Sequence, residues 1–271
     1  MIGSVAATVG LFVPTYFQVA LPSNPGNGFA LDRDGTILLA LLDPDDASAQ
    51  VVRYKVEGKS LVEVQRYDRK YEGQLEILPT ASGLAIVDYE SGFVGMFTKS
   101  GKLVWEAHAR FPNAARLDAY DNVWFFFNSG NVAKKTADSS AVEFILDSDG
   151  AEIDTGAPSD IVPLGTGGFY LLDAAGNVEK YAPNGRKQHI AKHDALRMIP
   201  AKSGGVILYS GQFVHIADNG TKRVLWDLPA SIDRNLVKRI SVTPKGSLGI
   251  AGQSSDGRSG FALILPNGLE G

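Results

Sequence analysis

The chain has 271 residues, of which 44% are hydrophobic and 21% are charged. These proportions are typical of a chain that packs a hydrophobic core, and they exclude an intrinsically disordered protein. The formal net charge is −4, so a nucleic acid, which is a polyanion, is not expected as the main partner. Because the chain has no cysteine, it cannot form a disulfide or a cysteine-ligated metal site.

The N-terminal segment is unusually apolar, and the first charged side chain is Asp32. Gly10, Pro14 and Gln18 interrupt the apolar stretch from residue 5 to residue 21. A membrane-spanning helix needs about 20 uninterrupted apolar residues, so we expect no membrane insertion. Aromatic and β-branched residues in this stretch favour a strand of the fold. The alternative is that it is the tail of a leader or an anchor.

Six repeats follow along the chain. In each, two short apolar strands flank a turn, as Phe29–Leu31 and Ile37–Ala40 flank Asp34-Gly35. The corresponding turn residues are Gly35, Gly83, Asn122, Gly168, Gly205 and Gly246, separated by 37 to 48 residues. Glycine and asparagine tolerate the positive φ that two-residue hairpin turns require. The pattern therefore predicts a hairpin at the start of every repeat.

A second turn follows within each repeat. Its glycines are Gly58, Gly101, Gly150, Gly185, Gly220 and Gly268. Two hairpins make four strands, and repeats of this length with four strands are typical of the blades of a β-propeller. No stretch shows helical periodicity. The sequence thus predicts an all-β, six-bladed propeller in which residues 1–271 form one monomeric domain.

The sixth repeat contains only three expected strands, near Val237–Val242, Ser247–Ala251 and Phe261–Leu265. The segment Thr15–Leu21 precedes the first repeat, where an additional outer strand is available. We expect this segment to pair with Phe261–Leu265 and complete the last blade. Such pairing would remove the open edges and close the ring.

Three segments resemble the NHL-repeat family of six-bladed propellers. Residues Asn24–Ala40 look like the opening of an NHL repeat, with a Pro-Gly-Asn-Gly, an apolar strand ending in Asp, a glycine turn and a second apolar strand. Residues Phe93–Val104 and Asn177–Arg186 look like its second half. The resemblance implies the fold, while the family includes both interaction scaffolds and enzymes. Bacterial members are often exported, which favours an extracytoplasmic location over the cytoplasm.

Charged residues recur on the strands expected to line the central channel. Aligning these strands on their apolar residues places Phe29, Glu76, Arg116, Val162, Arg197 and Arg239 at corresponding positions. Guanidinium groups bind carboxylate or phosphate bidentately, so the three arginines predict an anion site. Removing any one of them should then weaken binding by about 1.5–3 kcal/mol and leave folding intact. In the alternative, they satisfy backbone carbonyls or ion pairs, and their removal lowers stability instead.

Loops expected on one face of the propeller add polar and aromatic groups. They span Asp43–Ser48, Asp88–Ser91, Asn128–Asn131, Asp173–Asn177, Tyr209–Gln212 and Gln253–Ser259. Tyr89 and Tyr209 are placed at corresponding positions beside glycines. Aromatic rings among hydroxyl and amide groups suit a sugar or a peptide, although solvated turns have the same composition.

Two other patterns are not expected to form sites. His189, His193 and Asp194 have the spacing of metal ligands only if they lie on a helix, whereas the repeat places them on or just after an outer strand. The stretch 147–154 resembles part of a calcium loop but lacks the full acidic set. We therefore assign no catalytic residue, metal or cofactor.

Two functional hypotheses remain. The first is a non-catalytic propeller that binds a protein segment or a small anion on its loop face or in its channel. The second is a metal-dependent hydrolase, similar to lactonases, or a lyase of the six-bladed propeller group. An enzyme resembling the gluconolactonase family would need a divalent metal held by Glu, Asn and Asp in the channel, whereas here three arginines facing one glutamate would repel a cation.

Overall fold

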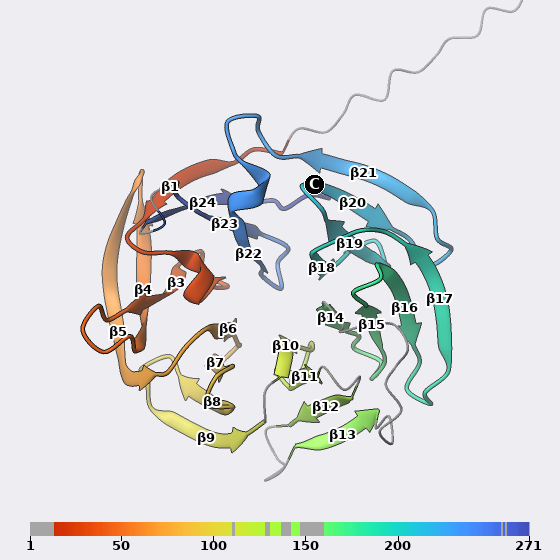
Figure 1. Cartoon of the computed structure of the whole chain (residues 1–271), viewed down its shortest axis with the longest axis horizontal. Helices are drawn as coiled ribbons and strands as arrows, with labels where there is room; N and C mark the ends of the chain where they lie inside the picture. Colours follow the sequence, from red (N-terminus) through yellow and green to blue (C-terminus); the bar gives the residue numbers. More distant parts are fainter. Residues whose placement is uncertain are drawn as a thin grey trace, which may run out of the picture.

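The computed structural model describes residues 14–109, 112–127, 131–136, 142–146, 160–255, 257 and 259–270. Its strands form six sheets of four antiparallel strands. Figure 1 shows the sheets arranged in a ring as the blades of a propeller, and we call the axis that their inner strands surround the channel. The predicted fold class is therefore confirmed.

We number the blades 1 to 6 in the order of their inner strands. The inner strands of blades 1 to 6 are β2 (Phe29–Leu31), β6 (Leu75–Pro79), β10 (Pro112–Leu117), β14 (Asp160–Pro163), β18 (Arg197–Pro200) and β22 (Val237–Val242). The second strands are β3 (Ile37–Leu42), β7 (Gly83–Asp88), β11 (Val123–Phe127), β15 (Phe169–Leu172), β19 (Val206–Tyr209) and β23 (Leu248–Gln253). The third strands are β4 (Ala49–Glu57), β8 (Phe93–Thr98), β12 (Val132–Lys135), β16 (Asn177–Tyr181), β20 (Gln212–Ile216) and β24 (Gly260–Leu265). The outer strands are β5 (Ser60–Tyr71), β9 (Leu103–His108), β13 (Glu143–Leu146), β17 (Lys187–Lys192), β21 (Lys222–Asp227) and, in blade 6, β1 (Phe17–Leu21).

The N-terminal strand closes the ring as predicted. β1 lies antiparallel to β24, with Phe17 opposite Ile264 and Leu21 opposite Gly260. Val19 and Leu21 alternate with exposed residues and are buried between blades 6 and 1. The last blade therefore gains its fourth strand from the opposite end of the described chain (Figure 1).

The hydrophobic core is divided into six clusters, each between two adjacent blades. Strand β11 contributes side chains to two of these clusters. Trp124 and Phe126 pack toward blade 4, while Phe125 packs toward blade 2. Because both faces of the sheet are covered, the strand is a continuous apolar run, whereas a half-exposed strand would alternate.

The inner hairpin turn of blade 2 has the predicted two residues, because Thr80 N–H donates to Gly83 O. The inner turns of blades 1, 3, 4 and 6 are one residue longer. In blade 1, Gly35 N–H donates to Asp32 O and Asp32 N–H donates to Thr36 O, which leaves three residues in the loop. This is a type I turn followed by a left-handed residue. Gly35 supplies that residue with φ 83°, and in blade 3 Asp121 supplies it with φ 61°.

Connections alternate between the two ends of the channel because neighbouring strands are antiparallel. The inner hairpin turns lie at one end, which we call the turn face. The links from second to third strands and from one blade to the next lie at the other, which we call the loop face. The helices among the described residues are two short 3₁₀ segments, η1 (Pro25–Asn27) and η2 (Arg234–Leu236), and no described helix is long or apolar enough to cross a membrane.

Ring closure can be tested at β1. Leu21→Ala should lower the free energy of unfolding by about 2–5 kcal/mol, because it leaves a cavity between blades 6 and 1. Gln18→Ala, on the exposed face of the same strand, should change it by less than about 0.5 kcal/mol. Urea unfolding of both variants measures the difference, and equal effects would show that β1 does not hold the ring.

Candidate functional site

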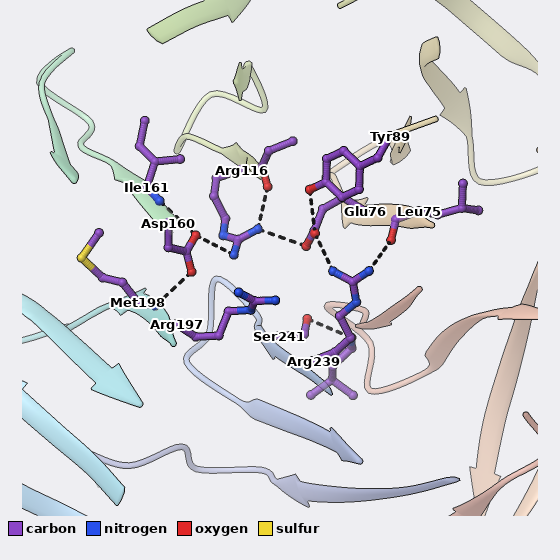
Figure 2. Close-up of polar contacts among 12 residues, drawn as sticks. Leu75, Glu76, Tyr89, Arg116, Asp160, Ile161, Arg197, Met198, Arg239 and Ser241 are labelled. Atoms are coloured by element: carbon purple, nitrogen blue, oxygen red, sulfur yellow. Dashed lines mark hydrogen bonds and ion pairs between the residues drawn. The ribbon is translucent and has the colours of Figure 1, made fainter. Parts of the chain in front are cut away.

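Four charged residues occupy the same position on four inner strands. Each lies three residues before the last paired residue of its strand, namely Pro79, Pro163, Pro200 or Val242. The four are Glu76, Asp160, Arg197 and Arg239. Together with Arg116, which is nearer the turn in blade 3, they form what we call the channel cluster (Figure 2).

Glu76 is the centre of the channel cluster. Its Oε1 accepts a hydrogen bond from Arg116 Nη1, and its Oε2 accepts one from Arg239 Nη1, both at 3.1 Å. The Tyr89 hydroxyl donates to Oε2 at 3.0 Å. Two guanidinium groups from blades 3 and 6 thus converge on one carboxylate of blade 2, well within the distance at which salt screens charges.

Asp160 is the second carboxylate of the cluster and is fully buried. Arg116 Nη2 lies 2.7 Å from its Oδ1. The backbone N–H groups of Ile161 and Met198 also donate to it, at 2.9 and 3.0 Å. Arg116 therefore bridges two acidic side chains, and Asp160 joins blade 4 to blades 3 and 5.

Arg239 extends this chain of contacts to the first blade. Its Nη2 donates to Gly26 O at 2.9 Å and to Leu75 O at 3.3 Å. Gly26 belongs to η1, which leads into blade 1. The contacts of Asp160, Arg116, Glu76 and Arg239 consequently link all six blades around the channel.

Arg197 differs from the other two arginines. Its Nη1 donates to Leu196 O at 2.9 Å, and no carboxylate of the described residues lies within ion-pair distance of it. Figure 2 draws no dashed line from its guanidinium to any residue shown. Its charge is therefore unpaired within the part of the chain that the structure describes.

Opposite charges within the cluster favour the charged forms of Glu76 and Arg116. Burial opposes ionisation of Glu76, but the surrounding guanidinium groups outweigh it and lower the pKa of the carboxyl below the ordinary 4.5. Burial also disfavours the charged form of Arg116, yet Asp160 and Glu76 outweigh it and raise the pKa of the guanidinium. The pKa of Tyr89 is raised by burial and then by Glu76. At neutral pH the cluster holds three positive and two negative charges.

The sequence alignment of the inner strands was wrong in three places, and one of them is Arg116, which lies two residues nearer the turn than Glu76, Arg197 and Arg239. Val162 packs in the core between blades 4 and 5, and Phe29 packs between blades 6 and 1. The cluster position of blade 4 belongs to Asp160, which the alignment missed. A signal was present: Glu76-Ile-Leu-Pro, Asp160-Ile-Val-Pro and Arg197-Met-Ile-Pro share one pattern. Counting back from the proline would have found it, whereas aligning apolar residues could not.

The two tyrosines do not occupy corresponding positions. Tyr209 lies opposite Arg197 in its hairpin, and the residue opposite Glu76 is Val87. The buried Tyr209 hydroxyl donates to Arg234 O at 3.4 Å, its ring packs against Phe213, and burial raises its pKa to about 12. Tyr89 contacts the channel cluster, whereas Tyr209 contributes to packing between blades 5 and 6.

A separate bridge lies on the turn face. The Asp121 carboxylate accepts hydrogen bonds from Arg33 Nη2 and from Ala81 N–H, both at 2.8 Å. These residues belong to the inner turns of blades 3, 1 and 2. The bridge ties three blades together at the end of the channel opposite the Arg197 position, so a ligand that contacts Arg197 is expected to enter from the loop face.

The other sequence patterns do not add to the site. His189 is exposed on the outer strand β17, and His193 follows that strand. The stretch 147–154 lies outside the described residues, as does most of the loop 128–131. Among the described residues, no three acidic or histidine side chains are grouped so as to hold a metal ion.

Comparison with known proteins supports the fold and leaves the family open. No family model and no curated protein sequence matches the chain. A protein of unknown function from Bacteroides caccae is similar in structure, with a TM-score of 0.54 and 14% identity over 90% of this chain and 85% of that one. The structure of YCF48 bound to D1 peptide is similar with a TM-score of 0.55 and 10% identity, over 94% of this chain and 97% of that one.

Substitutions of Arg116 and of Arg197 should change the free energy of unfolding by different amounts. Arg116→Met should lower the free energy of unfolding by about 3–5 kcal/mol, because it leaves buried Asp160 without its cationic partner. Arg197→Met should change it by less than about 0.5 kcal/mol, since no ion pair is lost. The two variants make the same charge change in the same cluster, so urea unfolding compares them directly. Equal losses would contradict the division into paired and unpaired arginines.

Glu76 should make the free energy of unfolding depend on pH in the acidic range. Because its folded pKa lies below its unfolded value, its contribution is complete above about pH 4.5 and is lost as pH falls through the folded pKa. The stability gap between the wild type and Glu76→Gln should therefore narrow as pH falls below 4.5. Urea unfolding from pH 7 downward measures this gap, and a gap that stays constant would show that the carboxylate is not stabilised as described.

Proposed function

We propose that this propeller binds a segment of another protein through a carboxylate, which pairs with Arg197 at the loop-face end of the channel. The observation that carries the proposal is the unpaired guanidinium of Arg197 inside a cluster with excess positive charge. Arg116 and Arg239 are held by Glu76, Asp160 and backbone carbonyls. They shape the site and repel cations, while Arg197 has hydrogen-bond donors to offer.

The surroundings of Arg197 favour a peptide over an isolated ion. Leu196 directly precedes it on the loop face and is 62% exposed. An exposed apolar side chain beside an unpaired guanidinium suits an acidic residue or a chain terminus with an apolar neighbour. YCF48, which shares the propeller architecture, has been seen with a bound peptide, and NHL-repeat propellers, which this chain resembles, include interaction scaffolds. Both likenesses are compatible with the proposal.

The hydrolase hypothesis is less well supported by the cluster. A divalent cation would need carboxylates that are free to bind it. Both carboxylates of the channel cluster are already paired with arginines, at 2.7 and 3.1 Å. A cation placed among them would also face three guanidinium groups. We therefore assign the channel to binding an anion.

A peptide array tests the proposed function. Acidic peptides and peptides with a free C-terminus should bind, and their amide counterparts should not. Arg197→Met should weaken binding about 10- to 100-fold, the effect of losing a charge-assisted hydrogen bond. The matched control is Arg186→Met, because Arg186 is exposed in a turn between strands β16 and β17 on the turn face. Binding that is the same for acids and amides, or that Arg186→Met weakens as much, would refute the proposal.

A further inference from the structure

We infer that the channel cluster selects a singly charged anion, such as one carboxylate, and discriminates against a doubly charged one such as phosphate or sulfate. This inference rests on the proposed function, and it names the chemical class of group that the same site accepts. Arginine clusters are commonly good sites for phosphate. Here the carboxylates that share the cluster change the preference.

The charge balance gives the first argument. Three guanidinium groups and two carboxylates leave one positive charge, and only Arg197 is without a carboxylate partner. One bound carboxylate brings the cluster to neutrality. A dianion would leave one negative charge in a partly buried site that already contains two carboxylates. In such a medium like charges interact strongly, so the second charge disfavours binding.

The fixed positions of the carboxylates give the second argument. Asp160 is fully buried and accepts two backbone N–H groups in addition to Arg116. Glu76 accepts Tyr89 as well as two arginines. Neither side chain can turn away from a ligand without leaving buried donors unsatisfied. Arg116 and Arg239 likewise cannot leave to serve a dianion, because each would abandon a buried partner.

Arg197 lies within electrostatic reach of these carboxylates. It directly precedes Met198, whose N–H donates to Asp160 Oδ2 at 3.0 Å, and it is one of the three arginines that lower the pKa of Glu76. An anion held by Arg197 is therefore exposed to the field of Glu76 as well. The selectivity follows from this proximity, and replacing Glu76 with a neutral residue of the same shape should relax it.

Methanesulfonate and sulfate make a matched pair of probes, because they are similar in shape, differ by one charge and do not titrate near neutral pH. Binding is followed by NMR shifts of the backbone amides of residues 195–198 at pH 7 and constant ionic strength. Methanesulfonate and propionate should bind the wild type at least as tightly as sulfate and inorganic phosphate. In Glu76→Gln, sulfate should gain at least about tenfold relative to methanesulfonate.

Two controls keep the result interpretable. Arg197→Met should abolish the shifts for every anion, which shows that they report this site. Asp160→Asn provides a second neutralised carboxylate if Glu76→Gln does not fold, and it should move the preference in the same direction. The melting temperature of each variant confirms that it is folded.

The possible outcomes test the charge selectivity and the proposed anion site separately. If wild-type protein binds sulfate more tightly than methanesulfonate at residues 195–198, the selectivity is wrong while the proposed anion site stands. If Glu76→Gln and Asp160→Asn both fold and neither changes the ratio, the carboxylates do not set the selectivity. If no anion shifts these amides, the proposed function and this inference both fail.

Discussion

Each blade of this protein has two apolar faces, and only the neighbouring blades can cover them. The six core clusters all lie between adjacent blades, so no blade completes its core alone. A row of such sheets would expose one apolar face at each end, and the ring must close to remove both. Closure depends on the pairing of β1 with β24, which joins the two ends of the described chain within one sheet.

Closing the ring brings the six inner strands together around the channel axis. The side chains of the channel cluster, which lie on these strands, are charged. Buried charges are tolerated only when they are paired and hydrogen-bonded. The channel cluster meets this condition through Glu76 and Asp160, whose partners come from several blades. The same contacts that neutralise the arginines therefore also hold the inner strands in a fixed arrangement.

The three arginines of the channel cluster differ in their partners. Arg116 and Arg239 are used by the fold, because each is bound to a carboxylate and to backbone carbonyls. Arg197 occupies the same strand position as Arg239 but has no acidic neighbour within ion-pair distance among the described residues. The alternative of structural arginines therefore applies to Arg116 and Arg239, and only Arg197 is left for the proposed anion site.

The architecture of this protein can be predicted from its sequence. Turn residues at regular spacing specify hairpins through local backbone conformation, and the apolar Thr15–Leu21 segment indicated how the last blade is completed. Which inner-strand residues contact one another depends on long-range strand pairing and cannot be predicted in the same way. Asp160 and Val162 differ by two residues on one strand, and a strand position is fixed by pairing with its neighbour rather than by the residue's own propensity. Contacts such as that of Glu76 with Arg239 join residues 163 positions apart, and ring closure alone brings them together.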